Sequence, residues 1–91
     1  MEIEVSVPAL LADCTGGKAR FPLAAHTLQE ALDRLFYDYP LLKHHVFTEP
    51  GKVRQHVLIC YNKDNIAWLD TLDIPLRHGD KVFIMQLVSG G

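Results

Sequence analysis

The sequence predicts a two-layer α+β domain in which one main helix packs on one face of a mixed, four- to five-stranded sheet. Two observations lead to this fold. Segments toward both ends of the chain have the alternating or apolar patterns of strands, and the one long segment with helical periodicity lies between them. A single helix covers only one face of such a sheet, so we expect the other face to stay open.

The first predicted element is a hairpin. Residues 3–7 alternate apolar and polar side chains, which is the period of a strand with one buried face. Pro8 ends this strand, because proline has no N–H to donate to a neighbouring strand. Residues 9–17 form a connection that finishes in a Thr-Gly-Gly turn, and residues 18–23 return as the second strand.

The helix begins after Thr27, whose hydroxyl can cap it, and Glu30 stands where a capping box requires an acidic residue. Apolar residues then recur at i, i+3, i+4, i+7, i+8 and i+11, which places them on one face. Pro40 ends the helix, because the residue before a proline is biased away from helical geometry. The apolar face consists of Leu28, Ala31, Leu32, Leu35, Phe36 and Tyr39.

The second half of the chain supplies the remaining strands. Residues 41–52 are expected to be irregular, with a short helical turn at 42–47. Residues 54–62 form a strong strand, a short strand or bend follows at 66–69, and the last strand covers 81–88. The helix would pack on apolar residues of the first, third and last strands, namely Ile3, Val5, Val7, Val57, Ile59, Val82 and Ile84.

The predicted order β-β-α-β-(β)-β is that of the β-grasp fold. The first and last strands are both strongly apolar, so we expect them at the centre of the sheet. Residues 1–91 would form one β-grasp domain, with residues 89–91 as a flexible C-terminal tail.

The composition argues against several classes of function. The 91 residues are 48% hydrophobic and 22% charged with a formal net charge of −2, so no basic surface for nucleic acid is expected. No apolar run reaches the roughly 20 residues that cross a bilayer, and the N-terminus lacks the pattern of a signal peptide. We therefore expect a cytoplasmic protein in which Cys14 and Cys60 stay reduced.

Neither an intrinsic active site nor a metal centre is predicted. Cys60 lies in an apolar strand and Cys14 in a loop without an activating neighbour, so no nucleophilic Cys–His pair can be assembled. The histidines lack the spacing of a zinc site, and two cysteines are too few for an iron–sulfur cluster. The sequence assigns no role to the five histidines, which are His26, His44, His45, His56 and His78.

Strand periodicity places a second group of apolar residues on the sheet face that points away from the helix. An exposed apolar cluster of this kind often marks a surface that binds a partner. The alternative is that residues 9–17 or 41–52 fold over this face, or that aromatic residues simply suit a pleated sheet. The predicted partner-binding residues are Leu58, Cys60, Phe83, Met85 and Leu87.

The chain ends in Ser89-Gly90-Gly91, directly after the apolar last strand. Glycine permits extended or positive-φ backbone and has no Cβ, so such a tail can be threaded into a narrow channel of another protein. The carboxylate of Gly91 is then the only group presented at its far end. Two terminal glycines also occur by chance, so this motif needs support from the rest of the chain.

These features together resemble the ThiS/MoaD family of ubiquitin-like sulfur carriers over essentially the whole chain. Within the family, the CysO-type carriers of cysteine biosynthesis are the most similar, in overall length, in Val7-Pro8 and in the Pro50-Gly51-Lys52-Val53 segment. The residues that carry the family resemblance are Glu2–Pro8, Thr15-Gly16-Gly17, the helix Thr27–Tyr39, Gly79-Asp80-Lys81-Val82 and Val88-Ser89-Gly90-Gly91.

The resemblance implies chemistry at the C-terminus and no catalytic side chain or bound cofactor in the chain itself. An E1-like enzyme with Mg-ATP would adenylate the Gly91 carboxylate, and a sulfur donor would displace AMP to leave a thiocarboxylate. In a CysO-type pathway, this sulfur would attack an aminoacrylate on a PLP-dependent cysteine synthase. A metallopeptidase would then release cysteine from the tail.

Two alternatives stay open at the level of sequence. The chain could be the small subunit of a molybdopterin synthase, or a carrier for thiamin, tRNA thiolation or another sulfur pathway. It could instead be a β-grasp interaction module that binds through a sheet edge or face without covalent chemistry. Deletion of Gly91 separates these classes, because a sulfur carrier would lose its function and an interaction module would keep its affinity.

Overall fold

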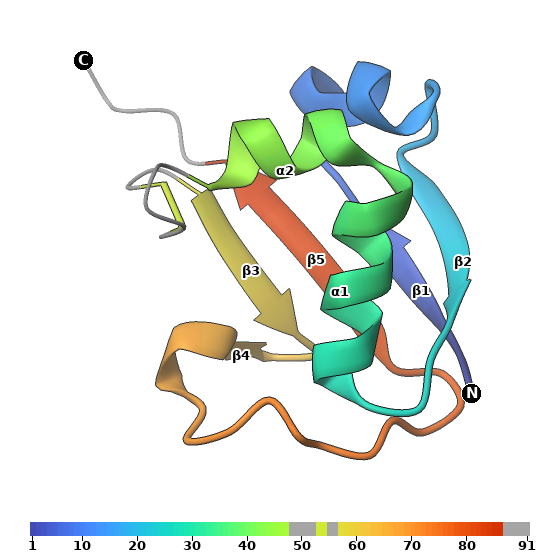
Figure 1. Cartoon of the computed structure of the whole chain (residues 1–91), viewed down its shortest axis with the longest axis vertical. Coiled ribbons are helices and arrows are strands. Elements are labelled where there is room, and N and C mark those ends of the chain that lie inside the picture. The colour runs from blue at the N-terminus through green and yellow to red at the C-terminus, as the bar shows by residue number, and fades with distance from the viewer. Residues whose placement is uncertain (48–52, 55–56, 87–91) are drawn as a thin grey trace.

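The computed structural model describes residues 1–47, 53–54 and 57–86 of the chain, and Figure 1 shows how their elements are arranged. Its helices and strands are β1 (Glu2–Ser6), the 3₁₀ helix η1 (Ala9–Thr15), β2 (Arg20–Ala24), α1 (Leu28–Asp38), α2 (Pro40–Val46), β3 (Val57–Tyr61), β4 (Asp64–Asn65), the 3₁₀ helix η2 (Ile66–Trp68) and β5 (Lys81–Gln86).

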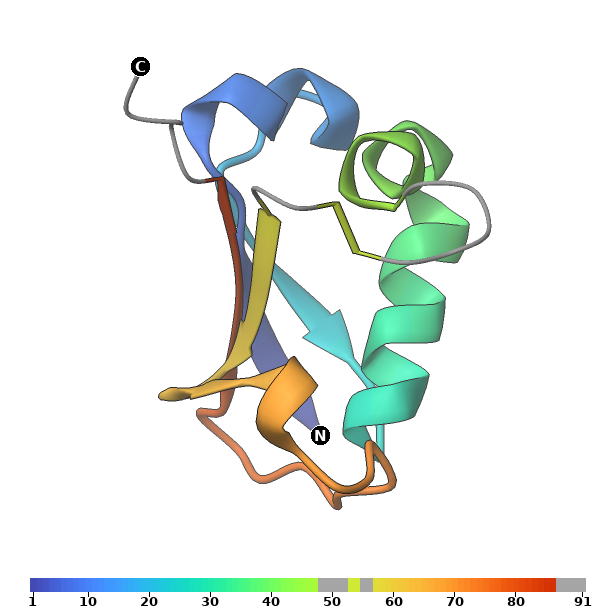
Figure 2. The same cartoon turned by 90° about the vertical axis from the view of Figure 1, so that its left-hand side faces the viewer.

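The strands form one mixed sheet in the order β2-β1-β5-β3-β4. β5 is parallel to β1 and antiparallel to β3, whereas the β1–β2 and β3–β4 pairs are antiparallel. Seen along the sheet, α1 and α2 lie on the same side of it (Figure 2). The predicted β-grasp fold is therefore confirmed, with the last strand at the centre of the sheet and the first strand beside it.

The core lies between α1 and the sheet, where the sequence pattern places it. All seven apolar strand residues that were expected beneath the helix are buried. Leu28 and Leu35 of α1 have no exposed surface, and Phe36 stacks edge-on against Phe47 with ring centroids 5.0 Å apart. Tyr39, the last residue of the predicted helical stripe, caps α1 and packs against Phe21 at 5.2 Å.

The start of α1 is capped as expected, but only one half of the predicted capping box is described. The Glu30 N–H donates to the Thr27 hydroxyl oxygen at 3.1 Å. The Glu30 carboxylate lies instead 3.3 Å from Nδ1 of His26. The single cap still satisfies one of the N–H groups that the first turn of a helix leaves without a partner.

Several predicted boundaries are wrong, each for a local reason. The connection expected at residues 9–17 contains a 3₁₀ helix at 9–15 that the sequence did not predict, and it closes at Gly16, whose φ of 68° suits glycine. The second strand is shifted to Arg20–Ala24. Pro40, which ends α1, also begins α2, because proline is favoured in the first turn of a helix. Residues 48–52 lie outside the described residues.

The third and fourth strands also differ from the prediction. β3 is described from Val57, and residues 55–56 lie outside the described part. Of the two possibilities expected at 66–69, a short strand or a bend, the strand is wrong, because a side-chain cap turns the chain there. The Asn65 carboxamide oxygen accepts the Ala67 N–H at 2.9 Å and starts η2, so only Asp64–Asn65 pairs with β3.

Along the described residues, no helix has both the length and the apolar character to cross a membrane.

Candidate partner-binding surface

Four of the five residues predicted to bind a partner lie together on the sheet face that points away from α1. In the β3–β5 register, Leu58 is opposite Met85 and Cys60 is opposite Phe83. The residues between them, such as Ile59 and Ile84, are buried on the helix side. Met85 is 47% exposed and the other three are half-buried. We call this group, Leu58, Cys60, Phe83 and Met85, the apolar patch.

Neither described segment that could have covered the apolar patch does so. Residues 9–15 form η1, which packs against α2 at one end of the molecule. α2 itself lies on the helix side of the sheet, beside α1 (Figure 2). Within the described ranges, the open face is therefore open as predicted. Leu87 and residues 48–52 are outside those ranges, as is the tail Ser89-Gly90-Gly91.

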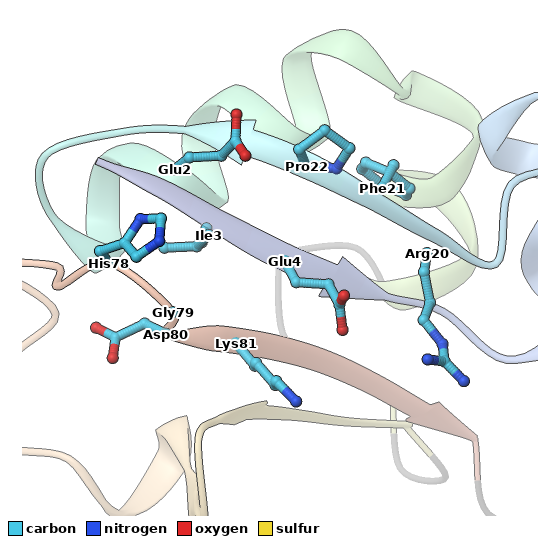
Figure 3. Close-up of a pocket in the computed structure, with 10 residues that line it drawn as sticks. All are labelled: Glu2, Ile3, Glu4, Arg20, Phe21, Pro22, His78, Gly79, Asp80 and Lys81. Carbon is cyan, nitrogen blue, oxygen red and sulfur yellow. The ribbon is translucent and has the colours of Figure 1, made fainter.

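A shallow hollow of about 360 Å³ lies next to the apolar patch, over β1, β2 and the start of β5. Its charged side chains come from three neighbouring strands and from the turn before β5 (Figure 3). Sequence reasoning did not find this feature, because it depends on which strands are neighbours. We call it the charged hollow, and its ionisable residues are Glu2, Glu4, Arg20, His78, Asp80 and Lys81.

Among the residues that the structure describes, Asp80 is the one ionisable residue of the hollow whose side chain accepts hydrogen bonds from other residues. Its Oδ2 accepts the Tyr61 hydroxyl at 2.5 Å and the Arg77 N–H at 2.8 Å, and its Oδ1 accepts Nδ2 of Asn62 at 3.3 Å. The Asn62 carboxamide oxygen in turn accepts the Lys81 N–H at 2.9 Å. These bonds join the end of β3 to the start of β5.

The titration of this pair agrees with its geometry. Burial, followed by the hydrogen bond to Asp80 and its negative charge, raises the pKa of Tyr61 to about 12. Partial burial acts to raise the pKa of Asp80, but the hydrogen bonds that its carboxylate accepts outweigh burial and hold the pKa below its ordinary value. At neutral pH the tyrosine is therefore a donor and the aspartate an acceptor. We regard this network as a structural latch and not as an acid–base site.

The edges of the sheet differ from its open face in what they offer a partner. The Val7 N–H donates to the Ala19 carbonyl and the Ala25 N–H to the Met1 carbonyl, so the odd-numbered residues of β2 bond to β1. Pro22, at the middle of β2, therefore removes a donor from the outer side of this edge strand. The opposite edge, β4, is only two residues long. Neither edge is a good template for an added strand.

The structure assembles no metal or disulfide site in the part that it describes. Cys14 and Cys60 are both free thiols. Over the described ranges, no three His, Cys, Asp or Glu side chains are grouped so that they could hold a metal ion. Among the histidines, His26 contacts Glu30 and His78 lines the charged hollow. An exposed apolar patch beside a charged hollow is typical of a surface that binds a protein.

Comparison with known proteins agrees with the fold and with the resemblance seen in the sequence. A sequence model of the ThiS family matches residues 5–91. The sulfur carrier protein CysO of Mycobacterium tuberculosis is 28% identical over 93 residues that cover both chains completely. Its crystal structure superposes with a TM-score of 0.77 at 26% identity, covering 94% of this chain and 99% of that one.

Two further structures share the fold. SAMP1, the small archaeal modifier protein 1 of Haloferax volcanii, has a TM-score of 0.75 and 26% identity, with full coverage of both chains. A chain from the complex of subunits 1 and 2 of the molybdopterin-converting factor of Helicobacter pylori has a TM-score of 0.64 and 23% identity, again with full coverage. The second likeness is one of fold alone.

Proposed function

This chain belongs to the ThiS family, and from that membership we propose that it is a sulfur carrier in cysteine biosynthesis, loaded at the carboxylate of Gly91. The observation that carries the proposal is the extent of the family match, which runs through the last residue of the chain and so includes the Gly-Gly tail. The CysO relative, similar over its full length, favours cysteine biosynthesis over the other sulfur pathways.

The proposed loading has two steps, both performed by an E1-like partner that supplies Mg-ATP. A carboxylate oxygen of Gly91 attacks the α-phosphorus of ATP, and pyrophosphate leaves. A sulfur nucleophile then attacks the acyl carbon of the adenylate, the C–O bond to AMP breaks, and a thiocarboxylate remains. Glycine suits this position because it has no Cβ to keep nucleotide and sulfur donor away from the reacting carbon. The chain acts as a co-substrate and contributes no catalytic side chain.

The position of β5 supports this division of labour. Pairing with β3 continues to Gln86, opposite Val57, so the central strand is held up to its last described residue. Five residues follow Gln86, and they span at most about 17 Å when extended. A partner must therefore place its nucleotide within that distance of the end of β5. Phe83 and Met85 of the apolar patch belong to β5, so a partner that docks on the open face lies beside the end of this strand. Its nucleotide can then be within reach of the tail.

The thiocarboxylate would donate its sulfur to an acceptor enzyme. The proposed acceptor is a PLP-dependent cysteine synthase, whose aminoacrylate is attacked by the sulfur, after which a metallopeptidase releases cysteine from the carrier. These steps take place in the cytoplasm, where the two free thiols stay reduced. A role as the small subunit of a molybdopterin synthase is the second candidate, and a likeness of fold supports it.

Intact-protein mass spectrometry tests the loading step. The chain and a variant that lacks Gly91 are incubated with E1-like enzymes, ATP and sulfide. We expect one oxygen to be replaced by sulfur in the full-length chain alone. The product must also be alkylated at the new sulfur, because oxidation of Met1 or Met85 adds nearly the same mass. No exchange across a panel of such enzymes, with the fold intact, would favour the non-covalent interaction module instead.

A second arm of the experiment separates the pathways. The loaded carrier is given either to a PLP-dependent cysteine synthase with its activated serine substrate or to the large subunit of a molybdopterin synthase with its pterin precursor. Formation of a cysteine adduct on Gly91 supports the first proposal. Sulfur transfer only to the pterin would move the chain to the second candidate.

A further inference from the structure

The charged hollow contains a row of alternating charges that crosses three neighbouring strands. Glu4 of β1 is in register with Lys81 of β5 on one side. On the other side, Arg20 of β2 is opposite Ser6, two residues along β1 from Glu4, and its side chain lines the same hollow (Figure 3). Adjacent strands are about 5 Å apart, so Lys81 lies beside Glu4, and Arg20 is the diagonal neighbour of Glu4 on the same open face. We call these three residues, Lys81, Glu4 and Arg20, the charged row. This row is continuous with the apolar patch, because Lys81 and Phe83 lie on the same face of β5.

The charges of this row are not used within the described part of the fold. No side-chain hydrogen bond or ion pair of the described residues engages Glu4, Arg20 or Lys81. The one charged contact among the described residues is between His26, which precedes α1, and Glu30 of α1. Arg20 and Lys81 are exposed and Glu4 is half-buried. Exposed charges of this kind add little to the stability of the free protein. They contribute mainly when a partner protein covers this face and places its own charges against them.

The rest of the molecule directs a partner to this face. Pro22 removes a donor from one edge of the sheet, and the other edge is two residues long, so strand addition is disfavoured at both. The apolar patch provides the desolvated centre that a protein interface needs. A protein that covers the patch also covers the adjacent row, and its own charges must then fit Lys81, Glu4 and Arg20.

We propose that Lys81 and Arg20 together receive an acidic side chain of the activating enzyme, and that this contact fixes the orientation in which the enzyme docks on the apolar patch. Lys81 and Arg20 are exposed, and neither has a side-chain partner among the described residues, so each can pair with a carboxylate that a partner brings to this face. The hollow also contains Glu2 and Asp80, and the Asp80 carboxylate already accepts hydrogen bonds within the fold. Glu4 competes with the partner's carboxylate for the two cations. This inference rests on the proposed function, since it assigns the partner as the enzyme that loads Gly91.

Because Glu4 competes with the partner's carboxylate, removing a cation and removing Glu4 should change the dissociation constant in opposite directions. Binding of Lys81→Gln, Arg20→Gln and Glu4→Gln carriers to E1-like enzymes is measured by isothermal titration calorimetry without ATP. We expect Lys81→Gln and Arg20→Gln to raise the dissociation constant about tenfold each, and Glu4→Gln to lower it. The effects should shrink as the salt concentration rises. The matched control is Lys43→Gln, which removes the same charge from α2 on the helix side.

Each outcome decides. Weaker binding of Glu4→Gln would mean that the row receives a cation, and it would overturn the proposal. Equal affinities for all four variants would also overturn it. The same holds for effects that are absent in this titration and appear only when it is repeated with ATP, because the anion that the cations receive would then be the nucleotide. No binding to any enzyme of the panel would overturn the docking surface as well. Binding with the expected signs but without thiocarboxylate formation would instead contradict the proposed function alone.

Discussion

Replacement of Tyr61 by phenylalanine tests the latch that joins β3 to β5. The change removes one hydrogen bond, from the tyrosine hydroxyl to the charged Asp80 carboxylate at 2.5 Å, and keeps the ring. A hydrogen bond to a charged group contributes about 1.5 to 3 kcal/mol. The site is only partly buried, and Asp80 keeps two other donors, so we expect the low end, about 1.5 kcal/mol. In a domain of this size, that loss lowers Tm by about 6 to 12 °C.

The same variant should change the alkaline limb of the stability curve. The pKa of Tyr61 is raised from 10.0 to about 12 in the folded chain, so the folded state holds its proton more tightly than the unfolded state. The stabilisation is complete below pH 10 and is lost as the pH rises toward 12. Urea unfolding at several pH values should show this fall in the native protein, and the fall should be smaller in Tyr61→Phe.

The exposed Tyr37 provides the matched control, because it is 84% exposed. Tyr37→Phe should leave both the free energy of unfolding and its pH dependence unchanged. The reasoning would be refuted if Tyr61→Phe unfolded at the same urea concentration as the native protein, or if both tyrosine variants lost the same amount.

Three further changes test the core, the helix cap and the open face. Leu35→Ala should cost about 2 to 5 kcal/mol of unfolding free energy, because Leu35 has no exposed surface and the change leaves a cavity; a loss below 1 kcal/mol in urea unfolding would argue against the described packing. Thr27→Ala should cost about 1 kcal/mol by loss of the α1 cap, and Thr27→Ser should restore most of it in the same assay. Met85→Asp should leave Tm nearly unchanged, since Met85 is 47% exposed, yet reduce thiocarboxylate loading at limiting enzyme; full loading would remove the apolar patch from the docking surface.

Patterns within a single element could be predicted from the sequence. The alternation in β1 and the helical stripe of α1 depend only on residues that are near in the chain, so their buried faces were correct. The placement of Leu58 and Met85 on one open face followed from the same period of two. Their role in binding a partner stays a prediction.

Features that depend on distant residues could not be predicted. Tyr61 and Asp80 are 19 residues apart in the chain, and they meet only because β3 and β5 are neighbours in the sheet. The charged row likewise needs the parallel β1–β5 register, which joins the two ends of the chain. Pro40 illustrates a local ambiguity, since the same residue can end one helix and begin the next.

The layout of β5 separates recognition from chemistry. The latch holds the start of this strand through Asp80 and Asn62, and pairing with β3 holds it as far as Gln86. The apolar patch and the charged row use the outer face of the same strand, whereas the reacting carboxylate is proposed at Gly91, beyond its end. Substitutions on the face should therefore alter the affinity of the partner, and changes in the tail should alter the reaction. Because the face is proposed to act on docking and the tail on the reaction, we expect their effects on loading to add as independent free energies.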